Sequence, residues 1–270
     1  MRVGSGALHA TVNAIFKAGG PDKMSGRALI DGSSALLVLP LAMVVPLPSG
    51  AWLCLAGSMA VHLFYLQCLI RAYAMADMSA VYPVMRGSAP VIAAIAATVV
   101  LGDAVTPVIA LAIGAVVIGT LLVAARNTPP LHTLGWAMAS GAAIAAFTVV
   151  DAKGVRAAPT TMSYVVWDFI ATGAGIGGFY AWWRGGDFIV AARSQWRAGL
   201  VAGALSVVTY GLALAAYKLG NVARLAALRE TSIVFGLVIA SVFLRERVNH
   251  TRAAGGVMIA LGAGVMILLG

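Results

Sequence analysis

Long runs of apolar residues, separated by short breaks rich in Gly, Pro and charged residues, recur along the whole chain. A helix needs about 20 predominantly apolar residues to cross the hydrocarbon core of a bilayer. Because lipid offers no hydrogen-bond partner to the edge of an open sheet, we expect these runs to be helices rather than strands. The pattern predicts about ten membrane-spanning helices, at residues 3–16, 28–45, 52–72, 79–100, 107–124, 134–151, 162–182, 198–217, 222–244 and 253–269.

The composition supports the same class of protein. Hydrophobic residues make up 61% of the chain, charged residues make up 10%, and the mean hydropathy is +0.95, whereas about 25% of the residues of a soluble domain are charged. The net charge is +9, but the Lys and Arg residues stand singly near the ends of apolar runs, which is typical of span termini. A nucleic-acid-binding protein would carry a dense basic stripe instead. We therefore expect an all-α integral membrane protein, surrounded by lipid, with no nucleic-acid partner.

The first apolar run is short for a membrane span. From Met1 to Lys17 it would cover only about 25 Å at 1.5 Å per residue, against a hydrocarbon core of about 30 Å. A tilted crossing or a locally thinned bilayer would accommodate it. We favour a natural start upstream of Met1, which makes the N-terminus of this chain a truncated one.

The two halves of the chain resemble each other. The segment "AYAMADMSAVYPVMRGSAP" from Ala72 matches "AYKLGNVARLAALRETSIV" from Ala216 with one residue gapped, and Arg86 then aligns with Arg229. Five predicted spans per half is an odd number, so the second copy must enter the membrane from the opposite side. Inverted repeats of this kind are typical of secondary transporters with a site near the bilayer midplane. We expect two inverted five-helix repeats, residues 1–126 and 132–270, around a central cavity.

Four segments resemble motifs of the EamA-type family of the drug/metabolite transporter superfamily, in the same order along the chain. They are "ALHATVNAIFK", "VYPVMRGSAP", "IAAFTVVDAKGVR" and "LAALRETSIVFGLVIASVFLRE", and the resemblance covers nearly the whole chain. It implies a ten-helix fold with a central cavity, cytoplasmic termini and alternating access for small metabolites. The Lys and Arg counts, about eleven after odd spans against five elsewhere, instead place both termini outside the cell by the positive-inside rule. The orientation stays open.

Arg86 lies in the middle of an apolar span, one helical turn after Tyr82 and on the same face. Pro83, Gly87 and Pro90 are expected to interrupt this helix and to free backbone groups that line a cavity. A guanidinium in the membrane costs about 2.5–3.5 kcal/mol on insertion scales, so it needs a partner or a role. Either Arg86 holds an anionic or carboxylate group of the substrate, with a hydrogen bond from Tyr82, or it pairs with an acid and joins the two halves.

Arg229 and Glu230 form the matching charged pair in the second half. Adjacent residues of a helix lie about 100° apart, so we expect one side chain to face the cavity and the other to face a neighbouring helix. Arg229 is a candidate substrate-binding residue. Glu230 is a candidate proton carrier because burial favours the neutral carboxyl; the alternative is an ion pair between Glu230 and Arg86.

His9, Asn13 and Lys17 recur every fourth residue on one face of the first predicted span. Asn13 is a candidate substrate-binding residue. His9 is a candidate coupling residue because imidazole titrates near neutral pH. The alternative is that both side chains only bond to a neighbouring helix, while Lys17 extends its ammonium group to the membrane interface.

Trp167 and Asp168 resemble a position of the same family in the seventh span. The resemblance implies that Trp167 walls the cavity, whereas Asp168 is expected only to cap a helix or to form a pair. Asp31 and Asp151 lie close to predicted span ends, where a solvated role is expected. The small-residue runs "GAGIGG" and "LGAG" predict close packing between helices.

The sequence shows none of the enzyme motifs that we considered. The HExxH pattern of metalloproteases is absent, the four His residues are dispersed, and neither Ser88 nor Ser140 lies in a nucleophile-type turn. We see no P-loop either. We therefore expect no enzyme activity, no metal site and no cofactor.

We expect a secondary transporter that works by alternating access, with export as the expected direction. Its substrates would be small polar or amphipathic metabolites, with amino-acid-like compounds as candidates, and the proton is the candidate coupling ion. The expected location is the bacterial inner (plasma) membrane, and a monomer would suffice. The alternative is an uncoupled facilitator or a membrane subunit that transports nothing.

Overall fold

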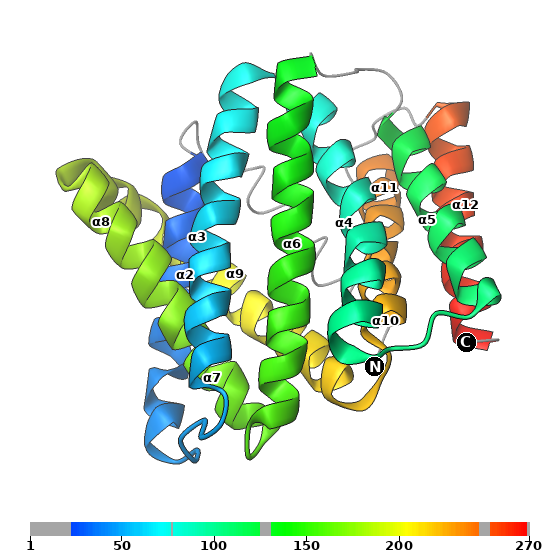
Figure 1. Cartoon of the computed structure of the whole chain (residues 1–270). Coiled ribbons are helices and arrows are strands. Elements are labelled where there is room, and N and C mark those ends of the chain that lie inside the picture. Colours follow the sequence, from blue (N-terminus) through cyan, green and yellow to red (C-terminus); the bar gives the residue numbers. More distant parts are fainter. Residues whose placement is uncertain (1–22, 77, 125–130, 243–248, 269–270) are drawn as a thin grey trace. The chain divides into compact units, whose positions relative to one another are not determined.

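The computed structural model describes residues 23–76, 78–124, 131–242 and 249–268, and within these ranges the chain is helical with no strand (Figure 1). Five helices there are long and apolar enough to cross a membrane: Trp52–Met75, Val84–Leu101, Leu131–Ala157, Ala192–Leu219 and His250–Leu268. Two shorter apolar helices are Ala28–Met43 and Pro107–Val123. The expected all-α membrane class is confirmed. The first predicted span, residues 3–16, lies outside the described ranges, and the inverted repeat stays a prediction.

The chain divides into two compact units, and each takes residues from both halves of the sequence. Unit 1 comprises Met1–Leu63 and Val150–Leu219, and unit 2 comprises Phe64–Val149 and Gly220–Gly270. The division passes through helix α3 (Trp52–Met75) and helix α6 (Leu131–Ala157). This is a division by spatial proximity, so it differs in kind from the predicted repeats 1–126 and 132–270, which stay a prediction.

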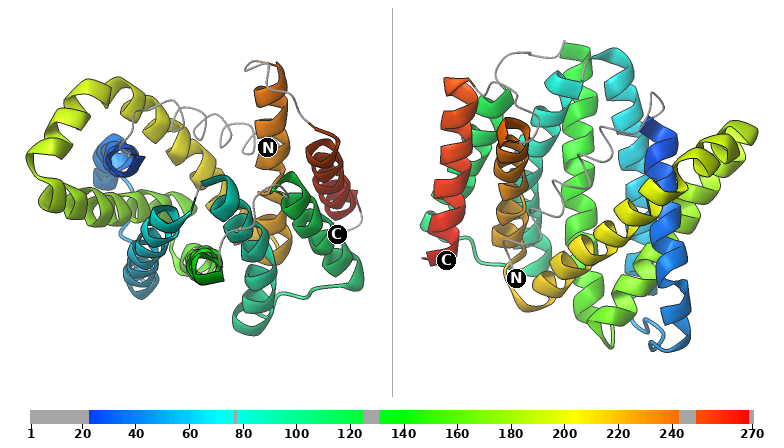
Figure 2. Two further views of the ribbon diagram at one scale, coloured as in Figure 1. Left: turned by 90° about the horizontal axis from the view of Figure 1, so that it is seen from above. Right: turned by 180° about the vertical axis from the view of Figure 1, so that it is seen from behind.

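Unit 1 contains a helix surrounded by the later part of the unit. Its elements beside parts of α3 and α6 are α2 (Lys23–Val38), the 3-10 helix η1 (Leu39–Met43), α7 (Thr161–Thr172), the π-helical segment η2 (Gly173–Gly177), α8 (Gly178–Arg184) and α9 (Gly186–Leu219). Seen from above, the chain from α7 to α9 curves around α2 (Figure 2). The curve needs glycine: a Cβ atom at Gly173 would lie 2.6 Å from the backbone oxygen of Asp31. The predicted close packing at "GAGIGG" is confirmed.

Two predicted spans of unit 1 differ in their bounds from the observed helices. The predicted span 162–182 is divided among α7, η2 and α8 without a loop. The predicted span 198–217 is part of α9, whose first residue is Gly186. The polar segment before Ala198 therefore continues into this span as one helix, because no Pro or left-handed Gly lies between Gly186 and Ala198 to end it.

Unit 2 adds five helices, which are α4 (Met78–Leu101), α5 (Pro107–Ala124), α10 (Val222–Leu228), α11 (Thr231–Val242) and α12 (His250–Leu268). Helices α5 and α12 pack backbone to backbone. A Cβ at Gly119 would lie 2.6 Å from the Gly255 oxygen, and a Cβ at Gly262, within "LGAG", would lie 2.7 Å from the Ala112 oxygen. Such closeness is possible only between small residues, as the sequence predicted.

The expected interruption of α4 is wrong. The helix runs unbroken from Met78 to Leu101, through Pro83, Gly87 and Pro90. Packing overrides the propensity of these residues, since Met85 to Gly87 and Ala89 to Pro90 are buried, and the Leu121 side chain of α5 lies 3.4 Å from the position of a Cβ on Gly87. Spanning helices tolerate Pro where neighbouring helices hold them in place.

The break occurs instead in the second copy of the motif. Helix α10 ends at Leu228, α11 begins at Thr231, and Arg229 and Glu230 form the turn between them. The turn is tightened by bonds between residues three apart: the Glu230 N–H donates to the Ala227 oxygen at 3.0 Å. The Thr231 hydroxyl donates to the Leu228 oxygen at 2.8 Å and so satisfies a carbonyl at the end of α10. The two charged side chains therefore start from irregular backbone within an apolar segment.

Candidate functional site

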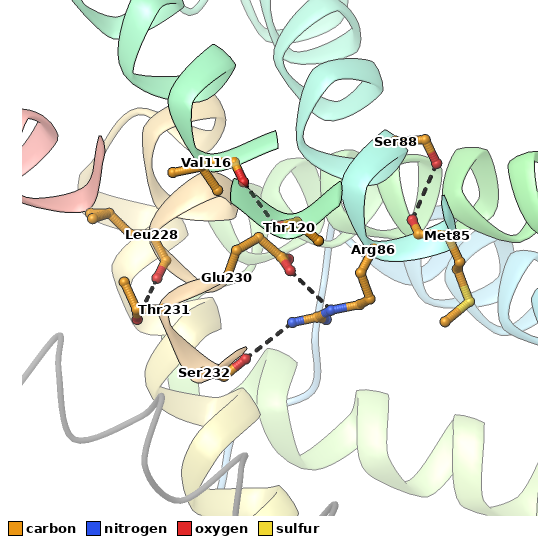
Figure 3. Close-up of polar contacts among 9 residues, drawn as sticks. All are labelled: Met85, Arg86, Ser88, Val116, Thr120, Leu228, Glu230, Thr231 and Ser232. Atoms are coloured by element: carbon orange, nitrogen blue, oxygen red, sulfur yellow. Dashed lines mark hydrogen bonds and ion pairs between the residues drawn. The ribbon is translucent and has the colours of Figure 1, made fainter. Parts of the chain in front are cut away.

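Arg86 reaches from α4 to the break between α10 and α11 (Figure 3). Its Nε lies 3.0 Å from Glu230 Oε2, and its Nη2 donates a hydrogen bond of 3.2 Å to the Ser232 hydroxyl. Arg86 is 5% exposed and Glu230 is 1% exposed, so both charges are removed from solvent. The Arg86–Glu230 ion pair that the sequence offered as one alternative is present within unit 2.

Arg229 adds a second positive charge to the break. Its side chain is half-buried, and its Nε has no hydrogen-bond partner among the residues that the structure describes. Glu230 interacts electrostatically with both arginines, Arg86 more strongly than Arg229. Two guanidinium groups and one carboxylate leave one net positive charge here. The arrangement suits an anionic group, because guanidinium binds carboxylate with charge-assisted hydrogen bonds.

The start of α10 is fixed to the connection between α4 and α5. The Asp103 Oδ2 accepts the Val222 N–H at 2.5 Å, and the Asn221 Nδ2 donates to the Ala104 oxygen at 2.8 Å. The Asn221 side-chain oxygen also accepts the Arg224 N–H at 3.0 Å, as a helix N-cap does. These contacts set where α10 begins. Sequence reasoning missed them, although Asp103 follows a Gly at a helix end.

The other sequence-predicted site residues are not gathered with Arg86. The backbone of Tyr82 lies in α4, but its side chain is outside what the structure describes. His9 and Asn13 lie outside the described residues. Trp167 belongs to unit 1, where its ring meets Trp52 edge to face with the centroids 5.5 Å apart. Its role as a cavity wall stays a prediction.

A second buried polar group lies in unit 1 around Asp151. The Asp151 Oδ1 accepts the Tyr164 hydroxyl at 3.0 Å, and the Oδ2 accepts the Tyr210 hydroxyl in a short hydrogen bond. Asp151 is fully buried, so the expected solvated role is wrong. The reason is that α6 continues past the predicted span end to Ala157, and Tyr164 from α7 and Tyr210 from α9 cover the carboxyl.

Asp168 and Asp31 belong to the same buried region. Asp168 is 2% exposed and Asp31 is 8% exposed, so the solvated role expected for Asp31 is also wrong, since the curve from α7 to α9 covers α2. Asp168 interacts electrostatically with Asp151 and Asp31, and its carboxyl accepts a side-chain hydrogen bond from Ser58 of α3. Its Oδ1 has no hydrogen-bond partner among the described residues. Sequence reasoning gave Asp168 only a capping or pairing role; its apolar neighbours Val166 and Phe169 were the signal for burial.

A hollow in unit 2 is of a different kind. It lies between α4 and α5, has a volume of about 430 Å³, and is lined by apolar side chains such as Val91, Ile95 and Ile113, with Thr98. No charged residue lines it. It therefore does not suit a polar substrate.

Known proteins resemble the second half of the chain in sequence and nearly the whole chain in fold. The model of the EamA-like transporter family matches residues 132–268. No curated protein matches the chain. A solved crystal structure superimposes with a TM-score of 0.72, covering 99% of this chain and 94% of that chain at 17% sequence identity. At that identity the likeness concerns the fold alone.

Proposed function

The chain belongs to the EamA-like transporter family, and from this membership we propose that it is a secondary transporter of small metabolites that carry a carboxylate group. The family is one of membrane transporters rather than enzymes, and the apolar helices make the chain a multi-pass membrane protein. Our proposal adds alternating access, export from the cell across the bacterial inner membrane, and amino-acid-like compounds as the first candidates.

The observation that supports this proposal is the net positive charge at the α10–α11 break. Arg86 and Arg229 carry two positive charges against the one negative charge of Glu230, within a segment that is otherwise apolar. Charges inside the membrane are rare and by default functional. Secondary transporters place substrate sites at discontinuous helices, where backbone and charged groups meet the polar part of the ligand.

The ion pair supplies a way to couple binding to movement. Glu230 and Ser232 hold the Arg86 guanidinium against the break. A substrate carboxylate competes with Glu230 for the two arginines, and each carboxylate that binds Arg86 releases Glu230 from it. The break therefore has two arrangements. In one the Arg86 guanidinium binds Glu230, and in the other it binds the substrate carboxylate. Alternating access needs such a pair of states with different ligand affinity.

The proposal is tested by binding and exchange with the purified full chain. A thermal-shift screen of amino acids, each paired with its methyl ester, should show stabilisation by the free carboxylate alone. Leucine against leucine methyl ester is the first pair. Proteoliposomes loaded with unlabelled leucine should then take up labelled leucine faster than empty ones.

A matched pair of variants tests whether the arginine at the α10–α11 break, rather than positive charge anywhere on the surface, recognises the carboxylate. Arg229→Gln should remove the preference for the free carboxylate over the ester, whereas Arg193→Gln, at an exposed position of α9, should keep it. Absence of accelerated exchange with every carboxylate that stabilises the protein would favour the alternative, an uncoupled facilitator or a non-transporting subunit.

A further inference from the structure

Unit 1 buries three carboxyl groups that come from three helices. Asp31 of α2, Asp151 of α6 and Asp168 of α7 are 8%, 0% and 2% exposed. The two charged groups that act on the Asp168 carboxyl in the described part of the chain are both acids, Asp151 first and Asp31 second. Burial and neighbouring like charge both disfavour an ionised carboxyl. The cluster is therefore a place where a proton is retained.

The hydrogen bonds decide which carboxyl retains it. Both oxygens of Asp151 accept tyrosine hydroxyls, one from Tyr164 and one from Tyr210, and hydrogen bonds donated to a carboxylate stabilise its charged form. Asp168 accepts one side-chain hydrogen bond, from Ser58, and its Oδ1 receives none from any residue the structure describes. A buried acceptor without a donor is costly, and a bound proton removes the charge from this carboxyl. Asp168 is therefore the protonated member.

Polar groups from five elements interact with Asp168. Its polar neighbours on the elements around it are Asp31 on α2, Ser58 on α3, Asp151 on α6, Tyr164 on α7 and Tyr210 on α9. All of these are acids or neutral hydroxyl groups, and the buried imidazole of His62 lies behind Ser58, with its Nδ1 3.3 Å from the Ser58 hydroxyl oxygen. A proton on Asp168 is thus the means, among these groups, by which the negative charge of the cluster is reduced.

The backbone after Asp168 departs from a regular α-helix. The Thr172 hydroxyl donates to the Asp168 backbone oxygen at 2.7 Å, and the π-helical segment η2 begins at Gly173. Gly173 lies against the backbone of Asp31. Single π-helical turns are rare and occur frequently at functional sites. A change of charge at Asp168 is thereby linked to the contact between α7 and α2.

The cluster does not have the arrangement of a metal site. No group of three or more His, Cys, Asp or Glu side chains among the described residues is placed to hold a metal ion. The three carboxyl groups therefore interact through space without converging on one ligand. This favours a proton over a metal cation as the bound species.

We propose that Asp168 is the proton-binding residue of this protein. Its carboxylate takes one proton from water to become a neutral carboxylic acid, and it returns that proton when unit 1 rearranges. Glu230, the candidate suggested by the sequence, is also buried, but it lies 3.0 Å from the Arg86 guanidinium, and an opposite charge at this distance favours the ionised carboxylate. The link between this proton and substrate movement rests on the proposed transporter function; the binding of the proton does not.

Infrared difference spectroscopy tests the proposal with the proton alone as the probe. The full chain, reconstituted in lipid, is cycled between acidic and alkaline buffer, and the carbonyl stretch of a protonated buried carboxyl is followed. The wild type should show this band, and Asp168→Asn should lose it. Glu230→Gln, and Asp103→Asn as an acid outside the cluster, should keep it. Retention of the band in Asp168→Asn, or its loss in Glu230→Gln, would overturn the proposal.

A second set of variants covers the case in which Asp168→Asn does not fold. Asp31→Asn, Asp151→Asn and Glu230→Gln are measured singly, and the band must persist in all three; its loss in any one assigns the proton elsewhere. Transport is read separately. Asp168→Asn should keep the exchange of labelled leucine for unlabelled leucine and lose its accumulation driven by a pH gradient. If leucine is not transported at all, the proposed function fails while the infrared result still decides on Asp168.

Discussion

The ion pair between Arg86 and Glu230 in unit 2 and the carboxyl cluster around Asp168 in unit 1 bury charge in opposite ways. In unit 2 the buried acid lies 3.0 Å from a guanidinium. In unit 1 Asp151 is held by two neutral hydroxyls, and Asp168 has other acids as its charged neighbours. The first arrangement places the buried acid against an opposite charge. The second allows the number of bound protons to change without breaking an ion pair.

Under the proposed function, this difference would assign anion recognition to one group and proton exchange to the other. A site that recognises an anion must stay positively charged at every stage, which the excess of arginine over acid at the α10–α11 break provides. A site that exchanges protons must be able to lose its charge, which arginine does not do in proteins. The comparison leads to predictions about which partner of each group can be removed.

The largest effect is expected when Arg86 is replaced. Arg86→Met leaves Glu230 buried without its cation, and breaking a buried pair in this way costs about 3–5 kcal/mol of stability. The double variant Arg86→Met/Glu230→Met removes both charges and should recover most of that loss, because an apolar pair of similar volume fits an apolar surrounding. The free energy of unfolding in mixed micelles measures both. A double variant no more stable than the single one would mean that the two charges are not each other's main partners.

The next effect concerns the hydroxyl partners of Asp151. Asp151→Ala removes the acceptor of Tyr164 and Tyr210, at a cost of about 1–3 kcal/mol for each hydroxyl left unsatisfied. Part of this is offset because one acid beside Asp168 disappears. The triple variant Asp151→Ala/Tyr164→Phe/Tyr210→Phe also removes the two unsatisfied hydroxyls. It should therefore be more stable than Asp151→Ala in the same unfolding measurement. If the triple variant has a lower free energy of unfolding than Asp151→Ala, the tyrosine hydroxyls have other essential partners. The contrast with unit 2 is then smaller than described.

The sequence anticipated unit 2 better than unit 1, and the reason is the type of residue. Charged residues are so few in the apolar runs that the possible partners of Arg86 reduce to a handful, and Glu230 was among them. The partners of Asp151 are tyrosines from two distant helices. Tyrosine is common at membrane interfaces as well as in cores, so no local pattern connects these positions.

Helix boundaries were predictable where lipid sets them and unpredictable where packing does. The run 107–124 coincides with α5, an apolar helix bounded by a Pro. Pro83 and Pro90 predicted a break in α4, yet packing keeps that helix continuous. The observed break, at Arg229 and Glu230, has no Pro or Gly beside it, because it is held by the Arg86 contacts and by the anchored start of α10.

A smaller effect is expected from the contact between η2 and α2. Gly173→Ala would place a Cβ 2.6 Å from the Asp31 backbone oxygen, and overpacking of this kind typically costs about 1–3 kcal/mol. Gly178→Ala, five residues later with nothing within 4 Å of its Cβ position, is the matched control and should be neutral or slightly stabilising. In the infrared measurement Gly173→Ala should also shift the band that we assign to Asp168. An unshifted band would separate the proton site from the α2 contact.

The smallest effect tests whether charge or hydrogen bonding holds Arg86. Ser232→Ala removes the 3.2 Å hydrogen bond from Arg86 Nη2 but leaves Glu230 in place, so the expected loss of stability is about 1 kcal/mol. Ser140→Ala is the control, because its buried hydroxyl bonds only to the Trp136 oxygen of its own helix, at 2.9 Å, a bond whose removal should cost almost nothing. If Ser232→Ala were as destabilising as Arg86→Met, the hydroxyl rather than the carboxylate would be the principal partner of the guanidinium. Unit 2 would then hold its charge as unit 1 does, through neutral groups, and Glu230 would again be available to bind a proton.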